Sequence, residues 1–99
     1  MTQLHFFEEA SEEAEEATRW YRERSGFAEA AFLAEFDHAI AVIMDAPQRW
    51  PKYIAGTRRY VFPTFPYSLI YFAEEVVVNV VAVAHHKRRH SHWQRRLHR

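Results

Sequence analysis

The sequence has no cysteine, only two glycines and no long uncharged apolar run. Without cysteine the chain forms no disulfide and offers no thiolate for catalysis or metal binding, so a reducing cytoplasm is the expected location. With so little glycine, little of the chain is flexible low-complexity linker. Residues 1–10 lack the basic and apolar regions of a secretory signal. No run approaches the roughly 20 apolar residues that cross a bilayer, so we expect no membrane segment.

The length and the apolar content predict one folded domain. A chain of 99 residues can build one hydrophobic core but not two, so residues 1–99 are expected to form a single domain. Hydrophobic residues make up 48% of it, which is too many for a disordered chain. Trp50 and Trp93 are the rings that we expect at a protein interface, because tryptophan is enriched at binding anchors.

The formal net charge is zero, but the two halves of the chain carry opposite charges. Residues 1–50 contain eleven acids and four bases, a formal charge of −7, and residues 51–99 contain nine bases and two acids, a formal charge of +7. The last fifteen residues contain six lysines and arginines, five histidines and no acid. This asymmetry predicts a basic face that binds an anion, with an acidic helical face turned away from it.

Two helical patterns occupy the first half. Residues 9–24 have apolar positions spaced by three or four, with acids near the start and arginines near the end, the polarity that the helix dipole favours. Gly26 is expected to end this helix in the left-handed conformation of a C-cap. A second periodic stretch ends before Pro47. The short break between the helices predicts an αα-hairpin. The apolar positions are Ala10, Ala14, Ala17 and Tyr21, then Phe32, Phe36, Ile40 and Ile43.

Four apolar runs predict strands, at residues 3–7, 58–62, 67–73 and 76–85. The last run is apolar on both pleat faces and therefore belongs in the middle of a sheet. Glu-Glu is poor chemistry for a two-residue turn, so the last hairpin should also involve Ala73 or Val76. The order strand, helix, helix, strand, strand, strand predicts an α+β fold. In it, a small and mainly antiparallel sheet packs on the αα-hairpin, and its other face stays partly open.

Several short motifs follow one another along the chain in a characteristic order. They are Trp20-Tyr21 at the end of the first helix, the loop 47–51, Phe65-Pro66-Tyr67 before a strand that ends in Ile70-Tyr71, and above all Ala82-Val83-Ala84-His85 followed by Arg88-Arg89 and Trp93-Gln94-Arg95-Arg96. Together they resemble the RelE/ParE toxin family of bacterial type II toxin–antitoxin systems. The resemblance implies a toxin that needs no cofactor. It also implies a cognate antitoxin as partner, in a toxin–antitoxin hetero-oligomer.

The resemblance implies one of two activities. RelE-like members cleave messenger RNA at the ribosome without a metal, using Lys and Arg on the sheet and a Tyr or His for proton transfer. ParE-like members bind and poison DNA gyrase. Ser68 stands where RelE-like nucleases carry an Arg, and Val61 stands where a Lys is expected, so a ParE-like inhibitor without catalysis is favoured. A RelE-like endoribonuclease and a non-toxic binding partner stay open as alternatives.

The candidate site residues follow from the basic C-terminal segment. A metal-independent nuclease needs a proton donor, a proton acceptor and cations for the phosphorane, and the candidates are His85, His86, His92, Arg59, Arg88 and Arg89, with His90 as a further proton carrier. Residues expected to contact the target or another anion are Arg58, Arg59, Lys87, Arg88, Arg89, Trp93, Arg95 and Arg96. The alternative, a solvated tail with only loose charge contacts, also stays open.

Metal binding is not expected. His86, His90 and His92 are close in sequence, but the chain has no cysteine and no acid near them to complete a zinc site. The basic residues instead predict an antitoxin with an acidic and apolar segment, which would complement Arg58, Arg59, Arg88 and Arg89.

Overall fold

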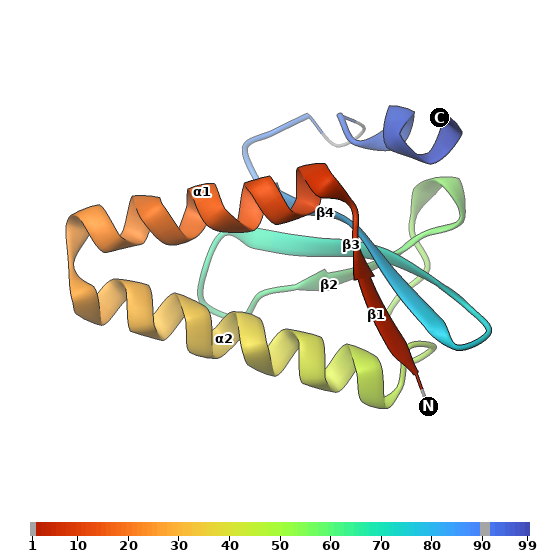
Figure 1. The fold of residues 1–99 in the computed structure, drawn as a ribbon, viewed down its shortest axis with the longest axis horizontal. Helices are drawn as coiled ribbons and strands as arrows, with labels where there is room; N and C mark the ends of the chain where they lie inside the picture. Colours follow the sequence, from red (N-terminus) through yellow and green to blue (C-terminus); the bar gives the residue numbers. More distant parts are fainter. Residues whose placement is uncertain (1, 90–91) are drawn as a thin grey trace.

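The computed structural model describes residues 2–89 and 92–99 (Figure 1). Its elements, in chain order, are β1 (Gln3–Phe6), α1 (Glu8–Arg24), α2 (Gly26–Asp45), the short helix η1 (Ile54–Gly56), β2 (Arg58–Val61), β3 (Tyr67–Glu74), β4 (Val77–His85) and the short helix η2 (Gln94–His98). The expected order of helices and strands is confirmed, with bounds that differ by one or two residues. None of the helices described is long and apolar enough to span a membrane.

The four strands form one mixed sheet in the order β1-β4-β3-β2. β1 runs parallel to β4 at one edge, and the pairs β4–β3 and β3–β2 are antiparallel. The apolar β4 is therefore central, as its sequence predicts. The hairpin between β3 and β4 turns at Glu75 and Val76, and Glu75 has a φ of 48°. The participation of Val76 in this turn confirms the expectation drawn from the poor Glu-Glu pair.

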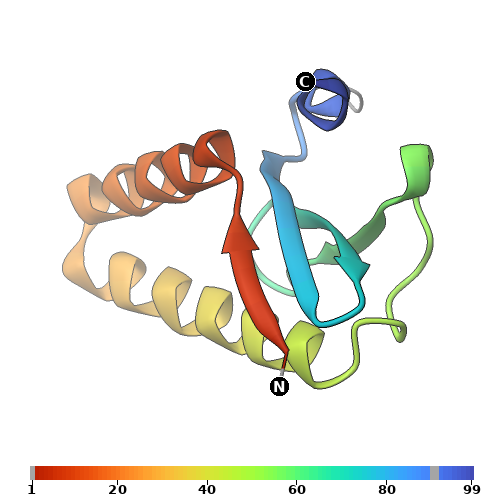
Figure 2. The same ribbon diagram turned by 45° about the vertical axis from the view of Figure 1, so that its right-hand side comes forward.

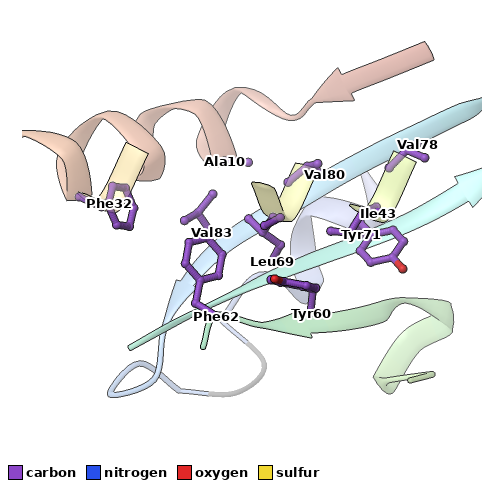
Figure 3. Close-up of a cluster of buried hydrophobic side chains, with 12 residues drawn as sticks. Ala10, Phe32, Ile43, Tyr60, Phe62, Leu69, Tyr71, Val78, Val80 and Val83 are labelled. Atoms are coloured by element: carbon purple, nitrogen blue, oxygen red, sulfur yellow. The ribbon is translucent and has the colours of Figure 1, made fainter. Parts of the chain in front are cut away.

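The helical hairpin packs on one face of the sheet and creates the main core (Figures 1 and 2). Phe32 and Ile43 of α2 meet Leu69, Tyr71 and other strand residues in this core, and Figure 3 shows these side chains converging. The 3.6-residue period of the helices and the two-residue alternation of the strands place all of these side chains between the layers. All eight apolar positions that the periodicity selected are buried in this core or packed against it.

The junction between the helices differs from the prediction. Ser25 is the single linking residue, with extended backbone at φ −171° and ψ 152°, and Gly26 begins α2. The Ser25 hydroxyl accepts a hydrogen bond from the Ala28 backbone N–H at 2.9 Å. The expected left-handed C-cap at Gly26 is wrong because a serine N-cap for the second helix takes its place.

The C-terminal segment folds back over the other face of the sheet, next to the start of α1 (Figure 2). Trp93 is only 1% exposed and packs with Ile70, Val81 and Ala82 in a second apolar cluster. The expectation that Trp93 is an interface ring is therefore wrong, because its side chain is used to dock the tail. Trp50 is half-buried and packs edge-to-face on Tyr60, with 4.8 Å between the ring centroids.

Candidate functional site

The basic residues after β4 divide into two sets, and the first set is bound to the acids of α1. Arg96 donates from Nη1 to Glu13 Oε1 at 3.0 Å and from Nη2 to Glu13 Oε2 at 2.9 Å. His92 Nε2 lies 3.4 Å from Glu13 Oε2, and Arg99 forms an ion pair with Glu9. The charge pattern predicts an acidic helical face turned away from the basic residues. This prediction is wrong, because the acidic face of α1 contacts the basic tail. It is the surface that holds the tail in place.

Glu13 and Arg96 also complete the edge of β4. β1 pairs with Val77 to Val80, so within the described residues β4 has no neighbouring strand on that side from Val81 onward. There the Val83 N–H donates to Glu13 Oε1 at 3.0 Å, and Arg96 Nη1 donates to the Val81 carbonyl at 2.9 Å. An unpaired buried backbone group costs about 1–3 kcal/mol, so two side chains do the work of a missing strand. We call this pair the edge clasp.

The ion pair between Glu9 and Arg99 shifts the pKa values of both groups. The hydrogen bond from Arg99 lowers the pKa of Glu9 from its ordinary value to about 2. The same contact raises the pKa of Arg99. Glu9 therefore stays charged through the mildly acidic range and keeps the last residue of the chain against α1.

The second set of basic residues has no carboxylate partner in the described part of the chain. Lys87, Arg88, Arg89 and Arg95 are exposed, and within residues 2–89 and 92–99 none of the four forms an ion pair with a carboxylate. A hollow of about 560 Å³ is lined by Arg88, Arg89, His92, Gln94 and Arg95. Four cations without a local counter-charge favour an anionic partner. We call Lys87, Arg88, Arg89 and Arg95 the free cationic surface.

A polar chain crosses the sheet face that the tail only partly covers. Arg59 Nε donates to Ser68 Oγ at 3.1 Å, and Ser68 Oγ lies 3.0 Å from His86 Nε2. Because arginine has no acceptor, Ser68 Oγ must accept from Arg59, which leaves the hydroxyl proton free to point to His86. With Arg88 and Arg89 these residues line a small hollow of about 30 Å³ beside Tyr53 and Trp93. Predicted site residues from three parts of the chain therefore meet here.

Val61 and Ser68 are directly opposite each other in the β2–β3 register. Val61 is 51% exposed, whereas Ser68 is buried beneath Arg59 and His86. These are the two positions at which a RelE-like nuclease is expected to carry cations. Both expected cations are therefore missing from neighbouring positions, and Arg59, which donates to Ser68, is the cation that remains beside them.

The candidate histidines lie in separate environments. The His85 ring packs edge-to-face on Tyr67, with 5.0 Å between ring centroids, and its Nδ1 accepts from the Lys87 N–H at 3.0 Å. Burial, together with the charges of Lys87 and His86, lowers the pKa of His85, so this ring is neutral near pH 7. His92 is held between Glu13 and the Arg89 carbonyl. His86 alone of these three bonds to the Arg59–Ser68 pair, and His90 lies outside the described residues.

Arg58 has a structural task. It donates from Nη1 to the Trp50 carbonyl at 2.7 Å and from Nη2 to Gln48 Oε1 at 2.9 Å, which fixes the loop after α2. Arg58 and Arg96 are therefore held by intramolecular bonds, unlike the four cations of the free surface. Sequence reasoning missed Glu9 and Glu13, although their spacing of four on one helix and the absence of acids in the tail were a usable signal.

The described part of the chain contains no cluster of three His, Asp or Glu side chains placed to hold a metal ion. Hydrogen bonds from arginine to carboxylate, serine and backbone carbonyl organise the surroundings of the site instead. What this arrangement offers a partner is fixed positive charge beside a neutral, partly apolar strand surface.

A four-stranded sheet with an αα-hairpin on one face and a basic C-terminal segment on the other defines a RelE/ParE-type toxin fold. The sequence profile described as "ParE toxin of type II toxin-antitoxin system, parDE" matches residues 4–90. The chain therefore belongs to the ParE toxin family. This confirms the family resemblance that the sequence motifs carried.

A solved structure supports the fold. The chain is similar to one described as "Chromosomal ParDE TA system from P. aeruginosa", with a TM-score of 0.73 and 11% sequence identity over 86% of this chain and 96% of that chain. At such low identity the likeness shows the fold alone. A search of curated protein sequences finds no significant match.

Proposed function

We propose that this chain arrests growth by binding DNA gyrase and that a cognate antitoxin neutralises it. The observation that carries this proposal is the adjacent pair Val61 and Ser68, two neutral side chains at the positions where a RelE-like nuclease is expected to carry cations. Membership of the ParE family supports the same choice. The activity is one of binding, without a catalytic step.

The placement of the histidines also supports binding over catalysis. Cleavage of RNA needs a base and an acid on opposite sides of one phosphate. His85 is neutral and packed on Tyr67, and His92 is held by Glu13, so only His86 reaches the Arg59–Ser68 pair. Arg59 itself donates to Ser68 and lies with its guanidinium 5.3 Å from the Tyr53 ring centroid. Its Nε–H is therefore already used within the fold.

The partner that fits the exposed surface is an antitoxin with acidic and apolar residues. Acids would complement the free cationic surface. Apolar side chains would cover Val61 of β2 and Ile54 of the preceding helix η1, which are both exposed. The expected product is a toxin–antitoxin hetero-oligomer. Gyrase and ribosomes are cytoplasmic, and the cytoplasm is the location that we propose.

A RelE-like ribosome-dependent nuclease is the second candidate. The observation in its favour is the Arg59–Ser68–His86 chain, which lines one hollow with Arg88 and Arg89 and could exchange a proton beside a bound phosphate. A family member that acts only as a binding partner is the third.

The test is to induce the chain in growing cells and to follow DNA breakage, plasmid supercoiling and messenger RNA cleavage within minutes. The gyrase proposal expects DNA breakage or lost supercoiling with intact messages. Rapid cleavage of translated messages would establish the nuclease instead, and unaffected growth would leave a binding partner. A Ser68→Ala variant sharpens the result, because only the nuclease depends on the proton relay through Ser68 Oγ.

A further inference from the structure

The free cationic surface has an unusual composition for a protein-binding patch. Arg88, Arg89 and Arg95 are exposed around the hollow that they line with Gln94 and His92. The apolar residues of the same segment, Trp93 and Leu97, point the other way and pack in the second apolar cluster. The outward surface is thus cationic and polar, with its apolar side chains used internally.

This separation distinguishes two kinds of anionic partner. Protein interfaces have a core from which charged residues are depleted and in which aromatic residues are enriched. Nucleic-acid interfaces are more polar and much more positively charged. The hollow lined by Arg88, Arg89 and Arg95 matches the second description. Among the described residues that line it, the one ring is His92, which is held by Glu13 and the Arg89 carbonyl and is therefore not a free platform for an unstacked base.

We infer that the free cationic surface binds the phosphate backbone of duplex DNA. In the setting of the proposed function, this DNA is the segment that gyrase holds, so the toxin would contact gyrase and its DNA at the same time. The inference rests on the proposed function for that setting, but the DNA contact itself can be measured without gyrase. Contacts to phosphodiester groups carry no sequence information by themselves, so we expect binding without regard to base sequence.

The fold anchors the backbone on both sides of these cations. The Arg88 N–H donates to the His85 carbonyl at 3.0 Å, and the His92 N–H donates to the Arg89 carbonyl at 3.2 Å, so backbone hydrogen bonds tie both ends of the Arg88-Arg89 pair. Arg95 lies two residues after buried Trp93 and directly before Arg96 of the edge clasp. Anchors therefore flank the cations, which limits the entropy lost when they meet a phosphate.

The charge distribution makes the contact local. The whole chain has a formal charge of zero, and its other half is acidic. Overall attraction to DNA is therefore weak, and binding must come from this one surface. Counterion release gives a slope of about −0.9 per phosphate in a plot of log binding constant against log salt. Four cations predict a slope between about −3 and −4.

The experiment measures binding of the purified full chain to a short fluorescent DNA duplex by anisotropy over a range of salt concentrations. The test variant is Arg88→Ala/Arg89→Ala/Arg95→Ala. The matched control is Arg19→Ala/Arg22→Ala/Arg49→Ala, which removes the same charge from exposed arginines elsewhere. The test variant should flatten the slope by about 3, because each lost phosphate contact removes about 1. The control should keep the slope, and the variant with lysine at the same three positions should keep most of the binding.

Three results would overturn the inference. They are equal DNA binding by the test variant and the wild type, tighter binding to poly-glutamate than to the duplex, and tighter binding to single-stranded RNA than to the duplex. A separate pull-down with DNA-free gyrase tests the proposed function. DNA binding without gyrase binding would support the inference and contradict the proposed function. Gyrase binding without DNA binding would support the proposed function and contradict the inference.

Discussion

The C-terminal segment contains two groups of arginines that share a composition and differ in what they touch. Arg96 and Arg99 meet Glu13 and Glu9 of α1, whereas Arg88, Arg89 and Arg95 meet no carboxylate in the described part of the chain. The first group is part of the fold and the second is available to a partner. A count of basic residues cannot separate them, because the separation depends on where two acids of α1 stand.

This division explains how a short tail can dock on its own fold and still bind an anionic partner. Its apolar residues and its paired bases attach it to the sheet and to α1, and the remaining bases stay outside. The side chains of Glu13 and Arg96 are only 15% and 12% exposed, so their attraction is poorly screened by water. The free group, at the surface, is screened by salt and depends on a partner for its effect.

The sharpest way to break the comparison is to remove each group in turn and measure toxicity. Arg88→Ala/Arg89→Ala should abolish growth arrest, because it halves the free cationic surface. The folded chain should lose no more than about 0.5 kcal/mol, since exposed side chains contribute little to stability. Plating efficiency after induction and thermal unfolding followed by circular dichroism measure the two effects. Growth arrest that survives in a well-expressed double variant would contradict a role for this surface.

The anchor of the tail should matter for stability instead. Trp93→Ala should lower the free energy of unfolding by about 3 kcal/mol, because removing a buried tryptophan leaves a cavity in the second apolar cluster. Trp20 is about half-exposed and provides the matched control. Urea unfolding of Trp93→Ala and Trp20→Ala compares them. Similar losses in both variants would mean that the tail is not docked in solution.

Breaking the edge clasp should have a somewhat smaller effect. Glu13→Gln keeps an acceptor for the Val83 N–H but removes the charge that Arg96 faces, and it should cost about 2 kcal/mol, less than the about 3–5 kcal/mol of a fully buried pair. Glu12→Gln, on the exposed side of the same helix, should change stability by less than about 0.5 kcal/mol. A third variant, Glu13→Ala, removes the acceptor as well as the charge. Hydrogen exchange at the Val83 amide should therefore be faster in Glu13→Ala than in the wild type, Glu13→Gln or Glu12→Gln. Unchanged protection there would contradict the clasp.

The smallest expected effect is on pH dependence. Glu9 has a folded-state pKa of about 2, below its ordinary value of 4.5. A carboxyl with a depressed pKa stabilises the fold above its unfolded pKa, and that contribution is lost as the pH falls from about 4.5 toward 2. The stability difference between wild type and Glu9→Gln should therefore be present at pH 6 and shrink over this window. A constant difference across it would mean that Arg99 does not bind Glu9.

Local sequence patterns predicted most of the fold. The helix period, the continuous apolar run of β4 and the prolines after α2 located the elements within one or two residues, since each signal is confined to neighbours in the chain. The serine cap at Ser25 was missed because Ser25-Gly26 fits both a C-cap and an N-cap. Only the packing of two helices with a one-residue link decides between them.

The site was predicted in its residue types but not in its division. The Arg59 and His86 side chains were candidates from composition and family resemblance, and the structure joins them through Ser68, which was not a candidate. The separation of His85 from His86 and the burial of Trp93 depend on which way each side chain points after β4 ends. The bond between Glu13 and Arg96 joins positions 83 residues apart, which no local pattern reports.

The short length of β1 has a consequence for handling the protein. Beyond Val80, the edge of β4 presents the backbone of a strongly β-forming run that would pair readily with another chain. In the part of the chain that the structure describes, the side chains of Glu13 and Arg96 are bonded to that edge and protect it. A chain cut before Arg96, or a tag that pulls η2 away, should therefore turn a well-behaved toxin into an aggregating one, even with every residue of the helical core intact.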